Sequence, residues 1–186
     1  MTEPELPKPD VPRAIAVVRD FVNTTDHETG ADDLSTQADL ARYFAREGLL
    51  QRQVRISAAD LALAHRLRAE LRTALEMNHD AVLGISPSPS SALRSLPIGM
   101  DWGAEGPGLR VTAAGARGAL ATIGLAAHDA TVHGLWQRLK ICSFDECEWA
   151  YYDKSKNRSR NWCEYGCGNK VKTRAYRTRQ RASAAS

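Results

Sequence analysis

The sequence has no apolar run that reaches the roughly 18 residues needed to span a bilayer. Residues 1–12 contain four prolines and several charges, so they lack the basic start and apolar centre of a secretion signal. We therefore expect a cytoplasmic protein without a membrane partner. Thiols stay reduced in that compartment, where clustered cysteines are more often metal ligands than disulfides.

The motifs of common enzymes are also missing. The sequence shows no Gly-rich phosphate-binding loop, no nucleophile elbow and no paired-histidine metal motif. Its five histidines are scattered along the chain. His128 and His133 would fall on different sides of a helix, because five residues turn it well past one full turn. We therefore expect no catalytic residues and no enzymatic activity.

Charge is unevenly distributed along the 186 residues. The chain is 43% hydrophobic and 25% charged, a balance that excludes a wholly disordered or collagen-like protein. Its net charge of +3 divides into +7 for residues 138–181 and −4 for the rest. A basic segment on a mildly acidic body favours a polyanionic partner.

Hydrophobic periodicity predicts a mainly α-helical protein with a small β-hairpin component. Helices are expected over 13–22, 36–48, 57–78 and 116–140. Ser35 or Thr36 can cap the second helix, and Ser57 with Asp60 resembles a capping box at the start of the third. The Gly/Pro/Ser-rich segment 84–91 predicts a break, and residues 93–112 favour a hairpin.

These elements define two domains. The expected organisation is a flexible tail over 1–12, a helical domain over 13–138, a small cysteine-containing module over 139–181 and a tail over 182–186.

The four cysteines follow the pattern Cys142-x4-Cys147-x15-Cys163-x3-Cys167. Zinc takes four ligands at the corners of a tetrahedron, and a spacer of about two to four residues lets one loop present two thiolates. Two such loops complete a closed shell, which predicts one structural Zn²⁺ held by all four cysteines. Four unrelated buried cysteines, or a redox pair that forms disulfides under stress, remain as alternatives.

The module resembles a treble clef in its order of elements. Residues 149–152 have strong strand propensity, 153–159 are rich in turn-forming residues, and 161–163 are expected to be the return strand. A helix is expected after Cys167 and Gly168, to about Ala182, and its first turn would supply the last ligands. Because the module has only about 40 residues, metal would supply much of its folding free energy.

The predicted last helix carries many cations. At about 100° per residue, four of them fall within one narrow stripe: Lys170, Arg174, Arg177 and Arg181. Lys172 and Arg179 lie near the opposite side, and small residues from Val171 to Ala182 form an expected packing side. The stripe repels itself, and a phosphate backbone would relieve this repulsion. The alternative is a solvated basic segment.

A second set of cations lies between the cysteine pairs, and its members alternate with polar residues: Lys154, Lys156, Arg158 and Arg160. If this segment were extended, all four would point the same way. We therefore predict that both sets bind DNA through phosphates, with base edges as further contacts for arginine.

Residues 139–181 closely resemble the CGNR zinc-finger family. The resemblance rests on Leu139-Lys140-x-Cys142, on the run from Asp153 to Cys163, and on Cys167-Gly168-Asn169-Lys170-x-Lys172. The family's Cys-Gly-Asn-Arg signature ends in Lys170 here, which keeps the charge but loses the planar fork of arginine.

The N-terminal part resembles that family's usual companion, the ABATE domain, through Phe21-Val-Asn23-Thr24-Thr25-Asp26. The resemblance implies a bacterial, stress-induced transcription regulator. Asn23 and Asp26 are candidates for lining a ligand pocket, or else they cap the first helix and fix its turn.

Taken together, the sequence predicts a zinc-dependent DNA-binding regulator whose N-terminal domain senses a ligand or forms a homodimer. Two other hypotheses stay open: a protein-interaction adaptor that uses the basic helix, and a redox switch in which oxidation releases zinc. The operator, the effector and the choice between DNA and RNA are not specified by the sequence.

Overall fold

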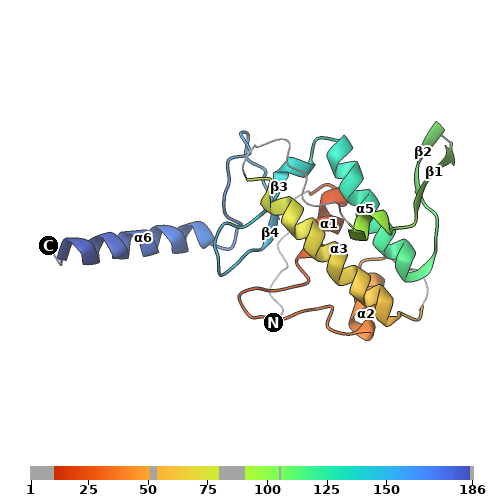
Figure 1. Cartoon of the computed structure of the whole chain (residues 1–186). Coiled ribbons are helices and arrows are strands. Elements are labelled where there is room, and N and C mark those ends of the chain that lie inside the picture. Colours follow the sequence, from red (N-terminus) through yellow and green to blue (C-terminus); the bar gives the residue numbers. More distant parts are fainter. Residues whose placement is uncertain (1–10, 51–53, 80–90, 105, 185–186) are drawn as a thin grey trace, which may run out of the picture.

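The computed structural model describes residues 11–50, 54–79, 91–104 and 106–184. Figure 1 shows a helical body with a β-hairpin at one end and a long helix projecting from the other. Residues 1–10 and 185–186 of the predicted tails and residues 84–90 of the predicted break lie outside the described residues, and residues 182–184 of the predicted C-terminal tail belong to the last helix. Within the described part of the chain, no helix is both long and apolar enough to cross a bilayer.

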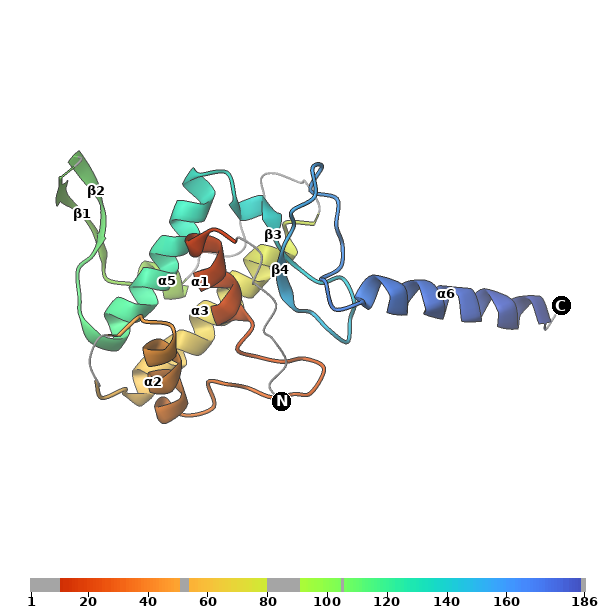
Figure 2. The ribbon, with the colours of Figure 1, turned by 180° about the vertical axis from the view of Figure 1, so that it is seen from behind.

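Three helices form the centre of the body: α1 (Arg13–Val22), α3 (Ala58–Glu76) and α5 (Gly115–Val132). In α3 a leucine recurs at every fourth position, and all of these side chains are buried: Leu63, Leu67, Leu71 and Leu75. This spacing places them on one face of the helix. Seen from behind, α1 crosses in front of α3 and α5 (Figure 2). The predicted mainly helical fold is confirmed.

Both α2 (Gln37–Arg46) and α3 begin with a capping box. The backbone N–H of Asp60 donates to the Ser57 hydroxyl at 3.1 Å, and the Asp60 carboxylate accepts from the Ser57 N–H at 3.0 Å. Thr36 and Asp39 make the same pair of bonds. Aspartate therefore fills the position that glutamate usually takes in this motif.

The predicted hairpin forms from β1 (Ile98–Gly103) and β2 (Gly106–Val111), after the short helix α4 (Ser91–Arg94). Two glycines of α5 allow the base of the hairpin to approach closely. A Cβ atom on Gly124 would crowd the Leu96 side chain, and one on Gly118 would overlap the Ala113 carbonyl. The base of the hairpin is thus fixed against α5.

The prediction that a helix continues to residue 140 is wrong, because α5 ends at Val132. Gly134 adopts φ +67°, the left-handed conformation that ends many helices. A single 3-10 turn, η1 (Trp136–Arg138), then leads into strand β3 (Leu139–Ile141). The side-chain amide of Asn78 holds this turn by donating to the carbonyls of Trp136 and Leu139 at 2.9 and 2.8 Å.

β3 pairs with β4 (Ala150–Tyr152) in an antiparallel hairpin. The predicted return strand at 161–163 does not form, because the loop from Cys142 to Cys147 already reverses the chain and brings β4 against β3. Leu139, Ile141 and Ala150 lie in the same buried cluster as the core residues of α1 and α3. The hairpin that carries the first cysteine pair is therefore packed into the helical body.

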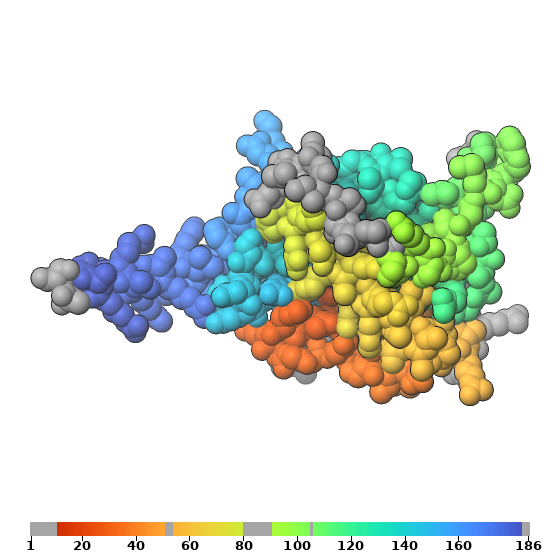
Figure 3. All heavy atoms as spheres, in the orientation of Figure 1, coloured from red at the N-terminus to blue at the C-terminus, as the bar shows by residue number. Residues whose placement is uncertain are grey.

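The last helix, α6 (Cys167–Ala184), forms as predicted. It projects away from the body, as the ribbon and the space-filling view both show (Figures 1 and 3). Its predicted packing side is largely wrong: Val171 packs beside the cysteines, whereas Ala175, Thr178 and Ala182 are exposed. The small finger contacts only the first turns of the helix.

Candidate metal centre

The four cysteine sulfurs converge on one point. They lie within 4.8 Å of one another, and all four residues are buried. The Cys147 and Cys163 sulfurs are 3.7 Å apart, and those of Cys163 and Cys167 are 3.6 Å apart. A tetrahedral ion with Zn–S bonds of about 2.3 Å requires sulfur separations of about 3.8 Å. The predicted ligand set is therefore brought together with the spacing that zinc requires.

Three chain segments present these sulfurs. Cys142 and Cys147 lie in the loop between β3 and β4, residues 142–149, which we call the metal loop. Cys163 lies in the loop that follows β4, and Cys167 is the first residue of α6. Backbone hydrogen bonds fix the first loop, with Cys142 N–H donating to the Trp149 carbonyl at 2.9 Å and Cys147 N–H to the Phe144 carbonyl at 2.8 Å. The Cys163 N–H points at the Cys142 sulfur, 3.5 Å away.

The electrostatics of the site also fit a bound cation. Burial raises the pKa of the Cys147 thiol to about 11, although a backbone hydrogen bond from Trp149 acts in the opposite direction. Burial likewise raises the pKa of Cys163. A divalent metal would replace the thiol protons and supply the positive charge that a buried cluster of thiolates lacks. The all-sulfur donor set suits a soft or borderline ion such as Zn²⁺.

Glu148, directly after the second ligand, adopts a left-handed backbone with φ +47°. This conformation is unusual for a residue other than glycine. Arg72 of α3 holds it in place by donating to the Glu148 carbonyl at 2.6 Å and to its carboxylate at 2.9 Å. An arginine of the helical body thus supports the turn that positions Cys147.

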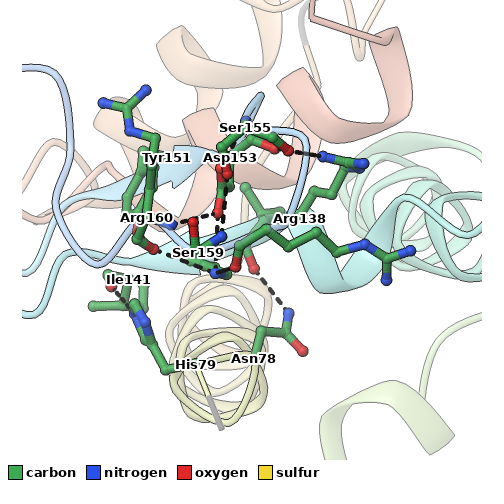
Figure 4. A network of polar contacts seen from close by, with 12 residues as sticks. Asn78, His79, Arg138, Ile141, Tyr151, Asp153, Ser155, Ser159 and Arg160 are labelled. Atoms are coloured by element: carbon green, nitrogen blue, oxygen red, sulfur yellow. Dashed lines mark hydrogen bonds and ion pairs between the residues drawn. The ribbon is translucent and has the colours of Figure 1, made fainter. Parts of the chain in front are cut away.

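A buried ion pair joins β3 to the residue after β4. Figure 4 shows Asp153 of this pair with the residues of the polar network around it. The Lys140 ammonium and the Asp153 carboxylate are 3.0 Å apart, with side chains only 3% and 0% exposed. Burial pushes the pKa of Asp153 up, but hydrogen bonds from Ser155 and Lys140 outweigh it and leave the pKa lowered. The Lys140 ammonium also donates to the carbonyls of Arg158 and Arg160. This lysine therefore contacts both ends of the segment from Asp153 to Arg160.

Residues 153–160 form a turn around that lysine, as the turn-forming residues of 153–159 indicated. The segment is not extended, so the condition under which all four cations would point the same way is not met. Asp153 accepts the Ser155 N–H at 2.9 Å and the Arg160 N–H at 3.0 Å, which closes the turn. Lys154, Lys156 and Arg158 are exposed. The Arg160 guanidinium is half-buried, 5.8 Å from the centre of the Tyr151 ring, and is paired with Glu164.

The cations of α6 fall into two groups. At its base, Lys170 pairs with Glu28 of the body at 3.2 Å, and Arg174 pairs with Glu146 of the metal loop at 2.5 Å. Both cations also lie over the ring of Phe144. Four other exposed cations of α6, one between this pair and three further along, have no ion-pair partner among the described residues: Lys172, Arg177, Arg179 and Arg181.

The two residues considered for a ligand pocket have different surroundings. The Asn23 side-chain amide pairs with the backbone of Ala150, donating at 2.9 Å and accepting at 2.7 Å, so it joins the end of α1 to β4. Asp26 accepts the backbone N–H groups of Glu28 and Thr29 within its own turn. Asp26 also lines a cavity of about 320 Å³ that borders the cysteine cluster, with the following residues around it: Glu28, Cys147, Trp149, Tyr165, Cys167 and Lys170.

Several residues of the body that contact the finger were not predicted from the sequence. Arg72, Asn78 and His79 reach the finger from the end of α3, and His79 contacts the Ile141 carbonyl. Nothing in their local sequence marks them, because their partners are more than 50 residues away. Asp153 with Ser155 did carry a signal, since an aspartate two residues before a serine favours a side-chain-capped turn.

Comparisons with known families match this architecture. A model for ABATE, described as "Putative stress-induced transcription regulator", matches residues 16–139, and a model for the CGNR zinc finger matches residues 138–180. The two matches meet where η1 passes into β3. A search of curated proteins returns no significant match. The chain therefore belongs to the ABATE family and carries a CGNR zinc finger over residues 138–180.

Proposed function

We propose that this protein is a zinc-dependent DNA-binding transcription regulator and that α6 is its main contact with DNA. The observation that carries the proposal is the composition and position of α6. The helix holds six basic residues and no acidic residue, and it projects from the metal centre into solvent (Figure 1). The family description supports a regulatory role in the response to stress.

The shape and charge of α6 suit a DNA groove. Its 18 residues form a rod of about 27 Å, and the major groove admits an α-helix. The outer cations, Lys172, Arg177, Arg179 and Arg181, are free to neutralise phosphates and release counterions. Arginine in particular can grip a phosphate or a guanine with two parallel hydrogen bonds.

The inner cations are placed differently, because Lys170 and Arg174 already pair with carboxylates. A phosphate would have to displace Glu28 or Glu146 to reach them. We assign them a secondary part in DNA binding, together with the exposed side chains of the 153–160 turn: Lys154, Lys156 and Arg158. Arg160 contributes less because it is half-buried and paired with Glu164.

One structural Zn²⁺ would hold the base of α6. Cys167 begins the helix and Cys163 precedes it by four residues, so the ion ties the helix to the β3–β4 loop. A closed four-cysteine site leaves no open coordination position for catalysis. The contribution of zinc is then the fixed position of α6 on the body.

The N-terminal domain would regulate this helix by sensing a ligand or by self-association. The cavity beside Asp26 is lined by both Glu28 and Lys170, the pair that joins the body to α6. A small molecule in this cavity would change how firmly Glu28 holds Lys170. Ligand binding in the body would in this way be coupled to the base of the DNA-contacting helix.

The direct test combines elemental analysis with a DNA-binding titration of the full chain. We expect one zinc per chain, and salt-sensitive binding to duplex DNA that disappears on chelation and returns when zinc is added back. Metal-loaded protein that shows no salt-sensitive binding to duplex DNA would overturn the proposal. A parallel titration with duplex RNA identifies the preferred nucleic acid.

A second candidate function is an adaptor that binds acidic proteins. It is favoured by the pairs Lys170–Glu28 and Arg174–Glu146, in which cations of α6 form ion pairs with protein carboxylates. The variant Arg177→Glu with Arg181→Glu, which reverses two exposed charges, distinguishes a DNA-binding regulator from a protein adaptor. A DNA regulator loses DNA binding in this variant. An adaptor shows no DNA binding even as wild type, and the variant loses its acidic protein partner.

A further inference from the structure

The β1–β2 hairpin has two unlike faces. In an antiparallel pair, residues directly opposite each other share a face, and successive residues alternate between faces. The register therefore puts only apolar residues on one face: Ile98, Met100, Trp102, Pro107, Leu109 and Val111. The other face consists of glycines with one acidic and one basic residue: Gly99, Asp101, Gly103, Gly106, Gly108 and Arg110.

The apolar face is covered at its base and open at its tip. Ile98 and Val111 are half-buried and pack against the core of the body. Met100 and Trp102 are 77% and 80% exposed, and they are the two most exposed large apolar side chains in the described part of the chain. The space-filling view shows the hairpin standing clear of the body (Figure 3).

The glycine face is covered by a side chain of the hairpin itself. The Arg110 guanidinium lies across Gly103 so closely that a Cβ atom there would overlap it. An isolated two-stranded sheet is at best marginally stable in water, and this hairpin forms a sheet of only two strands. The apolar face is therefore the surface that remains to be covered, on a hairpin whose base is held rigidly against α5.

We propose that this apolar face is where two copies of the chain associate. The face contains no charged residue, so two copies can meet there without repulsion between like charges. A buried tryptophan contributes roughly 150–250 Å², and the smaller apolar side chains contribute roughly 100 Å² each. Two tips together approach the roughly 1,000 Å² at which specific interfaces begin. A two-fold axis would match Trp102 against the same face of the second copy.

The position of the face is compatible with DNA binding. The hairpin and α6 lie at opposite ends of the molecule (Figure 1), so association through the hairpin leaves both copies of α6 exposed. A symmetric pair of DNA-binding elements reads two half-sites. The inference deepens the self-association proposed for the N-terminal domain and does not depend on DNA binding.

Sedimentation velocity of the zinc-loaded full chain without DNA, from about 1 to about 200 µM, tests the proposal. We expect a reversible dimer with a micromolar dissociation constant. The double variant Met100→Ser and Trp102→Ser should raise that constant at least tenfold. Asp101→Ser is the matched control, because it lies between them on the opposite face, and it should leave the constant unchanged.

Both side chains are largely exposed, so the double variant should keep the thermal midpoint of a wild-type monomer. If it does not, the single variant Trp102→Lys measured at the same concentrations replaces it. A wild-type chain that stays monomeric throughout, or a double variant that dimerises as tightly as the wild type, would overturn the proposal. Either outcome is independent of whether α6 binds DNA.

Discussion

The helical body and the zinc finger are stabilised by different means. The body buries leucines, alanines and aromatic residues from several helices in one large cluster. In the described part of the finger, four of the six residues of the buried cluster are the cysteines. The body has the apolar core of an ordinary domain, whereas the finger uses metal ligands where a larger domain would place apolar side chains.

The boundary between the two regions shows how they are combined. β3 and β4 belong to the matched finger region and yet contribute Leu139, Ile141 and Ala150 to the core of the body. Asn23, Arg72 and Asn78 add hydrogen bonds from the body to the same hairpin or to its loop. The first cysteine pair is therefore anchored by the body, whereas we expect the second pair and α6 to depend on a bound metal.

The largest expected effect is that of removing the metal. Chelation, or the variant Cys163→Ser, should release the second cysteine pair and α6 from their fixed positions and leave the body folded with the β3–β4 hairpin packed on it. The loss corresponds to about 10–16 kcal/mol of binding free energy in comparable zinc sites. Amide NMR spectra with and without chelator would show it as collapsed finger resonances beside dispersed body resonances.

Ser143→Ala is the control for that experiment, because it changes an exposed neighbour of Cys142 without removing a ligand. If the body and the finger unfolded together on chelation, the contrast between a self-sufficient core and a metal-dependent finger would be wrong.

The next largest effect is expected at the buried ion pair. Lys140→Met leaves the Asp153 carboxylate buried and without its ammonium partner, which should destabilise the finger by about 3–5 kcal/mol. A chelator-competition assay would report this as weaker zinc affinity. Lys154→Met provides the comparison, since Lys154 is exposed and should have little effect. Equal zinc affinity in the two variants would show that the pair does not hold the loop.

On acidification, the finger and the body should lose stability at different pH values. Two hydrogen bonds from Arg68 lower the pKa of Asp32 in the body. A folded-state pKa below the unfolded value of about 3.9 stabilises the body above that pH, and the benefit is lost as the pH falls through the folded pKa. In the finger, protons compete with the metal for the thiolates at a higher pH than the one at which Asp32 is protonated, because the free thiols are weak acids.

We therefore expect two transitions on acidification, metal release first and weakening of the body second. The absorption of Co²⁺ in a cobalt-substituted sample follows the first, and helical circular dichroism follows the second. Asp32→Asn should lower the stability of the body at neutral pH by roughly 1–2 kcal/mol and flatten its acid dependence. A single transition, or an unchanged acid profile in the variant, would contradict this reading.

The smallest effect is expected at the base of α6. Glu146→Gln removes the carboxylate that competes with phosphate for Arg174. Exposed ion pairs are weak, so DNA affinity should rise only about two- to fivefold. Fluorescence anisotropy can resolve this change. Asp145→Asn, at the neighbouring position, serves as the control, and a loss of affinity in Glu146→Gln would mean that the pair positions α6 for DNA instead of restraining it.

Local patterns predicted much of this fold. Capping residues, leucine spacing and the cysteine spacing each depend on residues a few positions apart, and they predicted most of the helices and the convergence of the four cysteines. The continuation to residue 140 failed because apolar spacing cannot distinguish a continuing helix from a partly buried turn that is followed by a buried strand. Gly134 was the available signal for the break.

The rest depended on long-range contacts. The pairing of β4 with β3 and the roles of Arg72 and Asn78 follow from how the finger docks on α3, which no local pattern records. Lys140 belonged to the motif that resembles the family, but a lysine is so rarely buried that its place at the centre of a loop was not predicted. The stripe on α6 was predicted, whereas its division into paired and free cations was not.

The central claim is that the free cations of α6 bind DNA, and the salt dependence of binding tests it most directly. Anisotropy titrations of zinc-loaded wild type and of the variant Arg177→Gln with Arg181→Gln should give straight lines of log affinity against log salt. Each lost phosphate contact reduces the slope by about 0.9, so the account predicts a variant slope shallower by about 1.8. Equal slopes for the two proteins would contradict it.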